Sequence, residues 1–247
     1  MFRVFLALCT AALGISEAAL AYDKKPPVPP GRDPGGVAIA LVCSGIDYTL
    51  PHLARRLARD GEGELIGWDL EDRDRQPFDK NRGHAAAEPG GDGTTVAAYL
   101  LAAHDVRLIP VRLNPADPLT IARAIAFVAQ TPARVVVVPG WARQTGDREA
   151  FRQAVMRFKE LLIVVDAEDY QPVLDFDNVL SVTPGRVSRA AVDLGGITYR
   201  LADERLAVAS AGLAAAALLG PEPRLGAAAL KRRLLEGAGA DTWRPRR

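Results

Sequence analysis

Short apolar runs alternate with amphipathic runs along most of the chain. Six runs have the length and the aliphatic, β-branched character of buried strands. They cover residues 37–42, 64–68, 106–113, 135–138, 161–165 and 179–182. Apolar residues spaced three or four apart predict helices over residues 51–59, 94–103, 117–128, 147–158, 207–219 and 225–235. Uniformly apolar strands separated by helices indicate an α/β fold of three layers, with a mainly parallel sheet covered on both faces.

The first residues have the pattern of a secretory signal peptide. Arg3 supplies a basic start, residues 4–15 are mostly apolar, and Ala19-Leu20-Ala21 fits a small-x-small cleavage site. The apolar run is too short to cross a bilayer. We therefore expect residues 1–21 to be removed and the mature chain, starting near Tyr22, to be exported to the periplasm or the extracellular space without a membrane anchor.

Composition divides the remaining chain into three parts. Residues 22–36 are rich in proline and glycine, which predicts an extended leader rather than part of the core. Residues 37–240 suffice for one domain, and residues 241–247 form a short basic tail. The net charge of +1 argues against a nucleic-acid partner. Cys43 is the only cysteine after the predicted signal, so the mature chain is expected to lack an intrachain disulfide.

Two motifs suggest a family. Residues 37–48 read VAIALVCSGIDY, and residues 91–97 read GDGTTVA. These segments resemble the first two catalytic blocks of the subtilisin-like serine proteases, in which an apolar strand ends in Asp-(Ser/Thr)-Gly-Ile-Asp and a helix opens with Gly-His-Gly-Thr-His-Val-Ala. The resemblance is collinear to about residue 237, and residues 204–219 align without gaps with the block of the nucleophilic serine. It implies a subtilisin-like, doubly wound sheet.

The resemblance also implies that the reactive residues are missing. It puts Cys43 at the catalytic aspartate, Asp92 at the histidine and Leu206 at the serine, with Asp169 at the oxyanion asparagine. A catalytic triad needs a hydroxyl, an imidazole and a carboxylate. Leu206 has no nucleophilic atom, an aspartate is a weak base at neutral pH, and an ionised Asp169 would repel an oxyanion. We expect a pseudoprotease that binds a peptide or protein in the former cleft.

Each substituted position also has a structural interpretation. Asp92, just before Gly93, fits a helix N-cap. Cys43 fits a small apolar residue at the end of a buried strand, and Leu206 fits a packing residue at a helix start. A reactive thiol at Cys43 stays open as an alternative, because parallel sheets bind ligands at the carboxyl ends of their strands.

Two other functions stay open. A relocated nucleophile would give an active serine or cysteine hydrolase; it needs His84 close to Cys43 or Ser44, or Ser210 facing the cleft in a shifted alignment. The other is an α/β small-molecule binder that shares only the sheet with proteases. His52 follows Pro51 and is expected to be exposed. The residues expected to line the cleft are Ser44, His84, Gly140, Trp141 and Ser210.

An acidic segment follows the second predicted strand. Its acidic residues alternate with Arg73, Arg75 and Lys80 and are Asp69, Glu71, Asp72, Asp74 and Asp79. Oxygen-rich loops can bind calcium, but the interleaved basic residues favour a solvated loop that neutralises its own charge. No other cofactor is expected.

Overall fold

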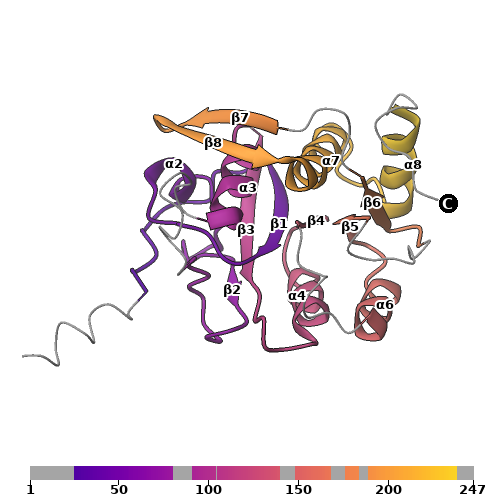
Figure 1. Cartoon of the computed structure of the whole chain (residues 1–247), viewed down its shortest axis with the longest axis horizontal. Helices are drawn as coiled ribbons and strands as arrows, with labels where there is room; N and C mark the ends of the chain where they lie inside the picture. The colour runs from indigo at the N-terminus through magenta and orange to yellow at the C-terminus, as the bar shows by residue number, and fades with distance from the viewer. Residues whose placement is uncertain are drawn as a thin grey trace, which may run out of the picture.

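A parallel six-stranded sheet forms the middle layer of the protein (Figure 1). The computed structural model describes residues 25–79, 91–103, 105–139, 148–167, 176–183 and 189–237. The strands are β1 (Val37–Cys43), β2 (Trp68–Asp69), β3 (Val106–Arg112), β4 (Val135–Val138), β5 (Leu162–Asp166) and β6 (Val179–Val182), in the order β2-β3-β1-β4-β5-β6. All five strand pairs are parallel. The predicted α/β fold is confirmed.

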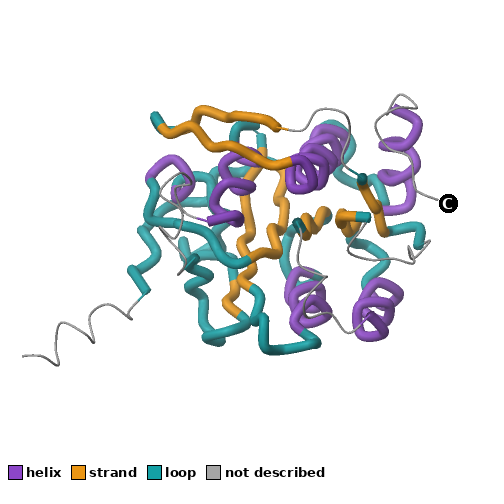
Figure 2. The backbone as a smooth tube through the Cα atoms, in the orientation of Figure 1, coloured by secondary structure: helices purple, strands orange, loops and turns teal. Residues whose placement is uncertain are grey.

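Helices cover both faces of this sheet (Figures 1 and 2). Helices α3 (Gly91–Leu101), α7 (Asp203–Leu219) and α8 (Ala227–Gly237) pack on one face, and α4 (Thr120–Val128) and α6 (Arg148–Arg157) on the other. Side chains alternate between the faces of a strand. Accordingly, Ile39, Leu41 and Cys43 of β1 belong to the first core, and Ala38, Ala40 and Val42 to the second.

The sheet is doubly wound around its first strand. Strand β1 pairs with β3 on one side and with β4 on the other, so the chain builds one half of the sheet and then returns to build the second. A crevice at the carboxyl ends of the strands forms where the winding direction changes, and α/β proteins bind ligands there. In this protein that point lies beyond Cys43 and Val138.

A hairpin that the sequence analysis did not anticipate lies between β6 and α7. Its strands, β7 (Arg189–Leu194) and β8 (Ile197–Ala202), are antiparallel and joined by Gly195 and Gly196 with φ of 62° and 78°. Positive φ at both turn positions is typical of tight hairpins. Tyr199 of β8 lies 2.7 Å from Nε2 of His52, which is only 5% exposed. The expectation of an exposed His52 is therefore wrong, because the hairpin covers it.

Two predicted elements are shorter in the structure. Helix α2 (Pro51–Ala54) stops before residue 59 because the next residues hydrogen bond to β3: the amide of Leu108 donates to Arg56, and that of Ala58 donates to Leu108. The strand predicted from residue 64 is regular only over Trp68–Asp69. Within the described ranges, no helix is long and apolar enough to cross a membrane.

The leader is attached to the domain by several contacts. Tyr48 donates from its hydroxyl to the carbonyl of Pro26 (2.7 Å), and Arg59 donates to the carbonyl of Pro29 (2.6 Å). Val28 packs against the core of β1 and α3. Asp33 accepts from the amide of Arg59 at 2.8 Å. Residues 25–36 form neither helix nor strand and none of them is fully buried, so they are an extended segment held on the surface of the domain by these contacts.

The leader also neutralises the acidic segment. Lys25 Nζ lies 2.6, 2.8 and 3.0 Å from carboxylate oxygens of Asp69, Asp72 and Asp74. Arg112 Nη1 lies 2.9 Å from Asp69 on the other side. The side chain of Asp69 has no exposed surface and that of Lys25 is 6% exposed. The expectation of a solvated loop that neutralises its own charge is therefore wrong at Asp69. This residue is buried, and its positive partners, Lys25 and Arg112, lie outside the acidic segment.

These carboxylates do not fit a calcium site. The ammonium group of Lys25 already lies among three of them, where a bound cation would have to sit. Burial lowers the pKa of Lys25, but its contacts with the three aspartates outweigh burial and raise the pKa above its ordinary value. Lys25 is thus held as a cation. Among the described residues, no group of three or more histidine, cysteine, aspartate or glutamate side chains is placed to hold a metal ion.

Candidate functional site

The first turn of α3 packs directly on the turn that follows β1. A methyl group at Gly93 would lie 2.1 Å from the carbonyl oxygen of Gly45 and 2.7 Å from Sγ of Cys43. Only glycine allows such an approach. Thr94 Oγ1 accepts a hydrogen bond from the amide of Asp47 at 2.9 Å and fixes the same contact. The two motifs found in the sequence therefore meet at the carboxyl edge of the sheet.

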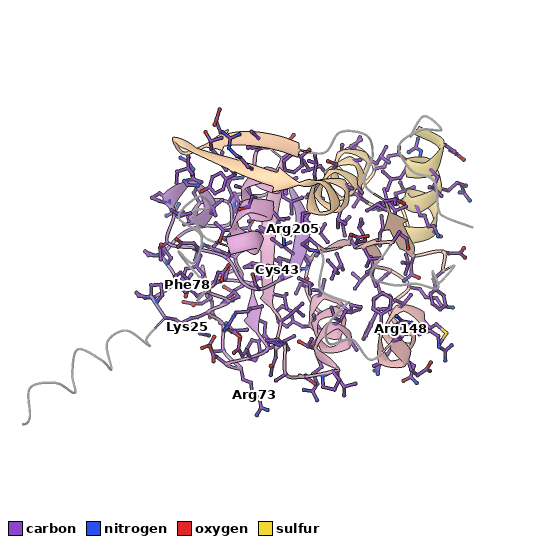
Figure 3. All side chains as sticks on the ribbon, in the orientation of Figure 1. Lys25, Cys43, Arg73, Phe78, Arg148 and Arg205 are labelled. Carbon is purple, nitrogen blue, oxygen red and sulfur yellow. The ribbon has the colours of Figure 1, made fainter. Side chains whose placement is uncertain are left out.

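Cys43 is enclosed by this contact. Its side chain is 2% exposed, and Sγ lies 3.5 Å from the carbonyl oxygen of Gly45. In Figure 3 it lies near the centre of the molecule, far from the labelled surface residue Arg73. A reactive cysteine needs access and an electropositive surrounding that favours the thiolate. The burial of Cys43 supports its interpretation as a small apolar residue.

Asp92 lies within α3 rather than at its cap. The helix begins at Gly91, so Asp92 is its second residue, and the N-cap interpretation is wrong. The backbone at residue 92 adjoins Gly93 and is therefore close to Cys43.

Leu206 is a core residue of α7. It lies in the first turn of the helix, which begins at Asp203, one turn earlier than predicted. Its side chain is 9% exposed and belongs to the core that also contains Val96 of α3 and Leu41 of β1. The position therefore holds a buried aliphatic group, as its packing interpretation requires.

Ser210 lies between two helices, away from the end of β1. Its Oγ is 2.9 Å from the hydroxyl oxygen of Tyr99. Tyr99 comes eight residues after the start of α3 at Gly91, which corresponds to about 12 Å along the helix. Ser210 therefore stabilises the contact between α3 and α7, and the structure does not bring it to Cys43.

Ser44 lies beside a carboxylate. Oγ of Ser44 is 3.4 Å from Oδ2 of Asp79, a residue that is 1% exposed. The backbone carbonyl of Ser44 accepts a hydrogen bond from Nε of Arg112 at 3.2 Å. Within the described part of the chain the only histidine is His52, and its Nε2 is bonded to Tyr199. The described residues thus give Ser44 no imidazole base.

The His52–Tyr199 pair is the polar contact that sequence reasoning missed. Burial and the nearby charge of Arg55 lower the pKa of His52. Burial, together with the charge of Asp47, raises the pKa of Tyr199 to about 12. Both groups are therefore neutral at pH 7. The only signal in the sequence is the Gly195-Gly196 pair, which marks a hairpin turn but not what the hairpin covers.

Four predicted site residues lie outside the described residues. They are His84, Gly140, Trp141 and Asp169. The strands that lead to two of these segments are described. Strand β4 ends at Val138 beside β1, and β5 ends at Asp166 beside β4. The roles of these four residues remain predictions.

Comparison with known proteins identifies the fold. No protein-family model and no curated protein sequence matches the chain. Among solved structures it is similar to the nisin leader peptidase NisP from Lactococcus lactis, with a TM-score of 0.57 and 13% identity over 86% of each chain. It is also similar to a cold-adapted subtilisin-like serine proteinase, with a TM-score of 0.51 and 14% identity over 81% of each chain. The predicted subtilisin-like fold is thereby confirmed.

Proposed function

We propose that this protein is an exported subtilisin-like pseudoprotease that binds a peptide or protein segment without cleaving it. One observation carries the proposal: the position aligned with the nucleophilic serine holds Leu206, whose side chain is packed into the core of a subtilisin-like fold. The alignment places Cys43 at the aspartate, and Cys43 is also buried.

The chemistry follows from these side chains. A serine protease forms a covalent acyl-enzyme, for which a hydroxyl oxygen attacks the scissile carbonyl while an imidazole accepts its proton. A buried leucine offers no such oxygen. Enzymes stripped of the triad retain about 10³–10⁴-fold catalysis over water through the oxyanion hole and substrate binding. An aspartate in place of the oxyanion asparagine, as the alignment gives at Asp169, would remove part of this remainder.

A binding role is supported by the topology. The chain leaves β1 and β4 at the point where the winding of the sheet changes, which is where α/β proteins bind ligands. The segment that follows Val138 contains Gly140 and Trp141. Tryptophan is enriched at the centre of binding interfaces because it offers a large apolar surface with one donor. We assign the peptide-binding cleft to this edge.

A cleavage assay tests the loss of activity. The chain from residue 22 onward should neither digest denatured casein nor react with a fluorophosphonate probe, under conditions in which a subtilisin does both. Activity that is lost in Ser210→Ala or Cys43→Ala would replace the proposal by a relocated nucleophile. Activity that persists in both variants would point to a contaminating protease and require repurification.

A binding assay tests the second half of the proposal. Fluorescein-labelled casein peptides of about 8–12 residues, each extended residue spanning ~3.3 Å, serve as the probe. Their anisotropy should rise on addition of the protein, and Trp141→Ala should weaken binding at least tenfold. Met156→Ala, an exposed change on α6, is the matched control and should have no effect. Equal binding by both variants would place the ligand elsewhere.

Export is tested separately in the native host. The amino-terminal sequence of the secreted or periplasmic protein should begin at or near Tyr22. A cytoplasmic protein that retains Met1 would contradict this part of the proposal.

A further inference from the structure

A second candidate site lies at the edge of the sheet opposite to Cys43. A cavity of about 730 Å³ opens where β1 and β3 begin, and the last turn of α7 closes its side. Strand β1 is seven residues long, so its two ends are about 20 Å apart. The cavity is therefore distinct from the proposed peptide cleft.

The size and the lining of this cavity suit a small amphiphilic molecule. Pockets for small ligands occupy about 300–1,000 Å³ and are mostly apolar with a few polar groups. The apolar residues that line it include Val37, Ala103, Pro132, Leu213, Ala216 and Pro221. The charged residues of the lining are Arg107, Arg134 and Asp105.

The charges around the cavity leave one arginine uncompensated. Arg107 forms an ion pair with Asp33, and Asp105 interacts electrostatically with Arg56. Among the described residues, the guanidinium group of Arg134 has neither an ion pair nor a hydrogen bond. The immediate surroundings thus carry a net charge of +1.

Two further groups restrict the charge of a ligand. The carboxyl-terminal end of α7 brings a partial negative charge to the cavity. The carboxylate of Glu222, next to the lining, is paired with Arg233 and adds no free negative charge. One guanidinium group against a helix carboxyl terminus suits a single negative charge better than a phosphate dianion.

We propose that this cavity binds a monocarboxylate with an apolar body, such as a medium-chain fatty acid. The carboxylate pairs with Arg134, whose planar guanidinium group can donate two parallel hydrogen bonds to it. The apolar body lies between the first residues of β1 and the last turn of α7. Among the described residues, the Nε atoms of Arg107 and Arg134 have no hydrogen-bond acceptor, and a small rotation of Arg134 toward the carboxylate would satisfy one of them.

Titration calorimetry with decanoate, below its micelle concentration, tests this site. One decanoate should bind per chain. Arg134→Gln should weaken binding at least tenfold, because charge-assisted hydrogen bonds are about twice as strong as neutral ones. Ala217→Phe changes an exposed residue of the lining and should weaken binding similarly by filling the cavity. Arg55→Gln, an exposed arginine outside the cavity, is the matched control and should stay within twofold of the unmodified protein.

A second ligand separates charge from general apolar binding. The neutral 1-decanol, measured by equilibrium dialysis, should bind at least tenfold more weakly than decanoate. The proposal is overturned if decanoate binding is absent or not saturable at one per chain. It is also overturned if decanol binds as well, or if Arg134→Gln and Arg55→Gln behave alike. The peptide assay does not involve this edge, so the two proposals can fail independently.

Discussion

Replacement of Lys25 by methionine tests whether the leader stabilises the domain. Lys25→Met keeps the length of the side chain but removes the ammonium group from among Asp69, Asp72 and Asp74. Breaking a buried ion pair by removing one partner costs about 3–5 kcal/mol. Here the cost is reduced, because Arg112 still pairs with Asp69, and the side chains of Asp72 and Asp74 are 31% and 41% exposed to water. We expect a loss of about 2–3 kcal/mol.

Urea unfolding at pH 7 measures this loss. Lys159→Met, on an exposed residue, is the matched control and should change the free energy of unfolding by at most about 0.5 kcal/mol. The contacts raise the pKa of Lys25 in the folded protein. Its stabilisation is therefore present below the unfolded value of about 10.4 and is lost as the pH rises through the folded value. A loss at pH 7 no larger than that of Lys159→Met would refute the reasoning.

Three further predictions concern the site and its cover. Burial lowers the pKa of His52 in the folded protein. The stability that the neutral imidazole contributes is therefore present above about pH 6.5 and is lost as the pH falls. His52→Gln should make the melting temperature fall less steeply between pH 7 and 5. Gly93→Ala should destabilise by about 3 kcal/mol in urea, since its methyl group would overlap a backbone oxygen; a neutral change would contradict the packing. The Cys43 thiol should react with Ellman's reagent only in denaturant, and rapid native labelling would show it accessible.

The sequence predicts the sheet well because its strands are buried on both faces. Strands of this kind are continuous apolar runs, so β1, β3, β4 and β5 are recognisable without knowledge of their neighbours. The hairpin β7–β8 was missed because polar residues interrupt both of its strands, and because it packs on α3 and α7 rather than within the apolar sheet. Helix α2 was predicted too long for a related reason: the hydrogen bonds of residues 56–58 to β3 override local helical preference.

The candidate site was predictable where the family resemblance relates two motifs, and not where a contact joins residues outside those motifs. Cys43 and Gly93 belong to two motifs whose meeting the resemblance implies. The burial of Asp69 by Lys25 joins residues 44 positions apart, and no local pattern encodes it. The same holds for His52 and Tyr199, which are 147 positions apart. Charge patterns within the acidic segment favoured neighbouring arginines as partners, whereas the structure supplies Lys25 and Arg112.

The central place of β1 has a consequence for the order of folding. The first strand to be synthesised has both of its partners downstream, in β3 from residue 106 and in β4 from residue 135. One edge of β1 stays unpaired until β3 has been made, and the other until β4, when more than half of the 247 residues have been made. Because long-range pairing closes large loops, it slows folding. The sheet can therefore be completed only late in synthesis, and this delay would favour passage of the unfolded chain through a translocation channel if the protein is exported as proposed.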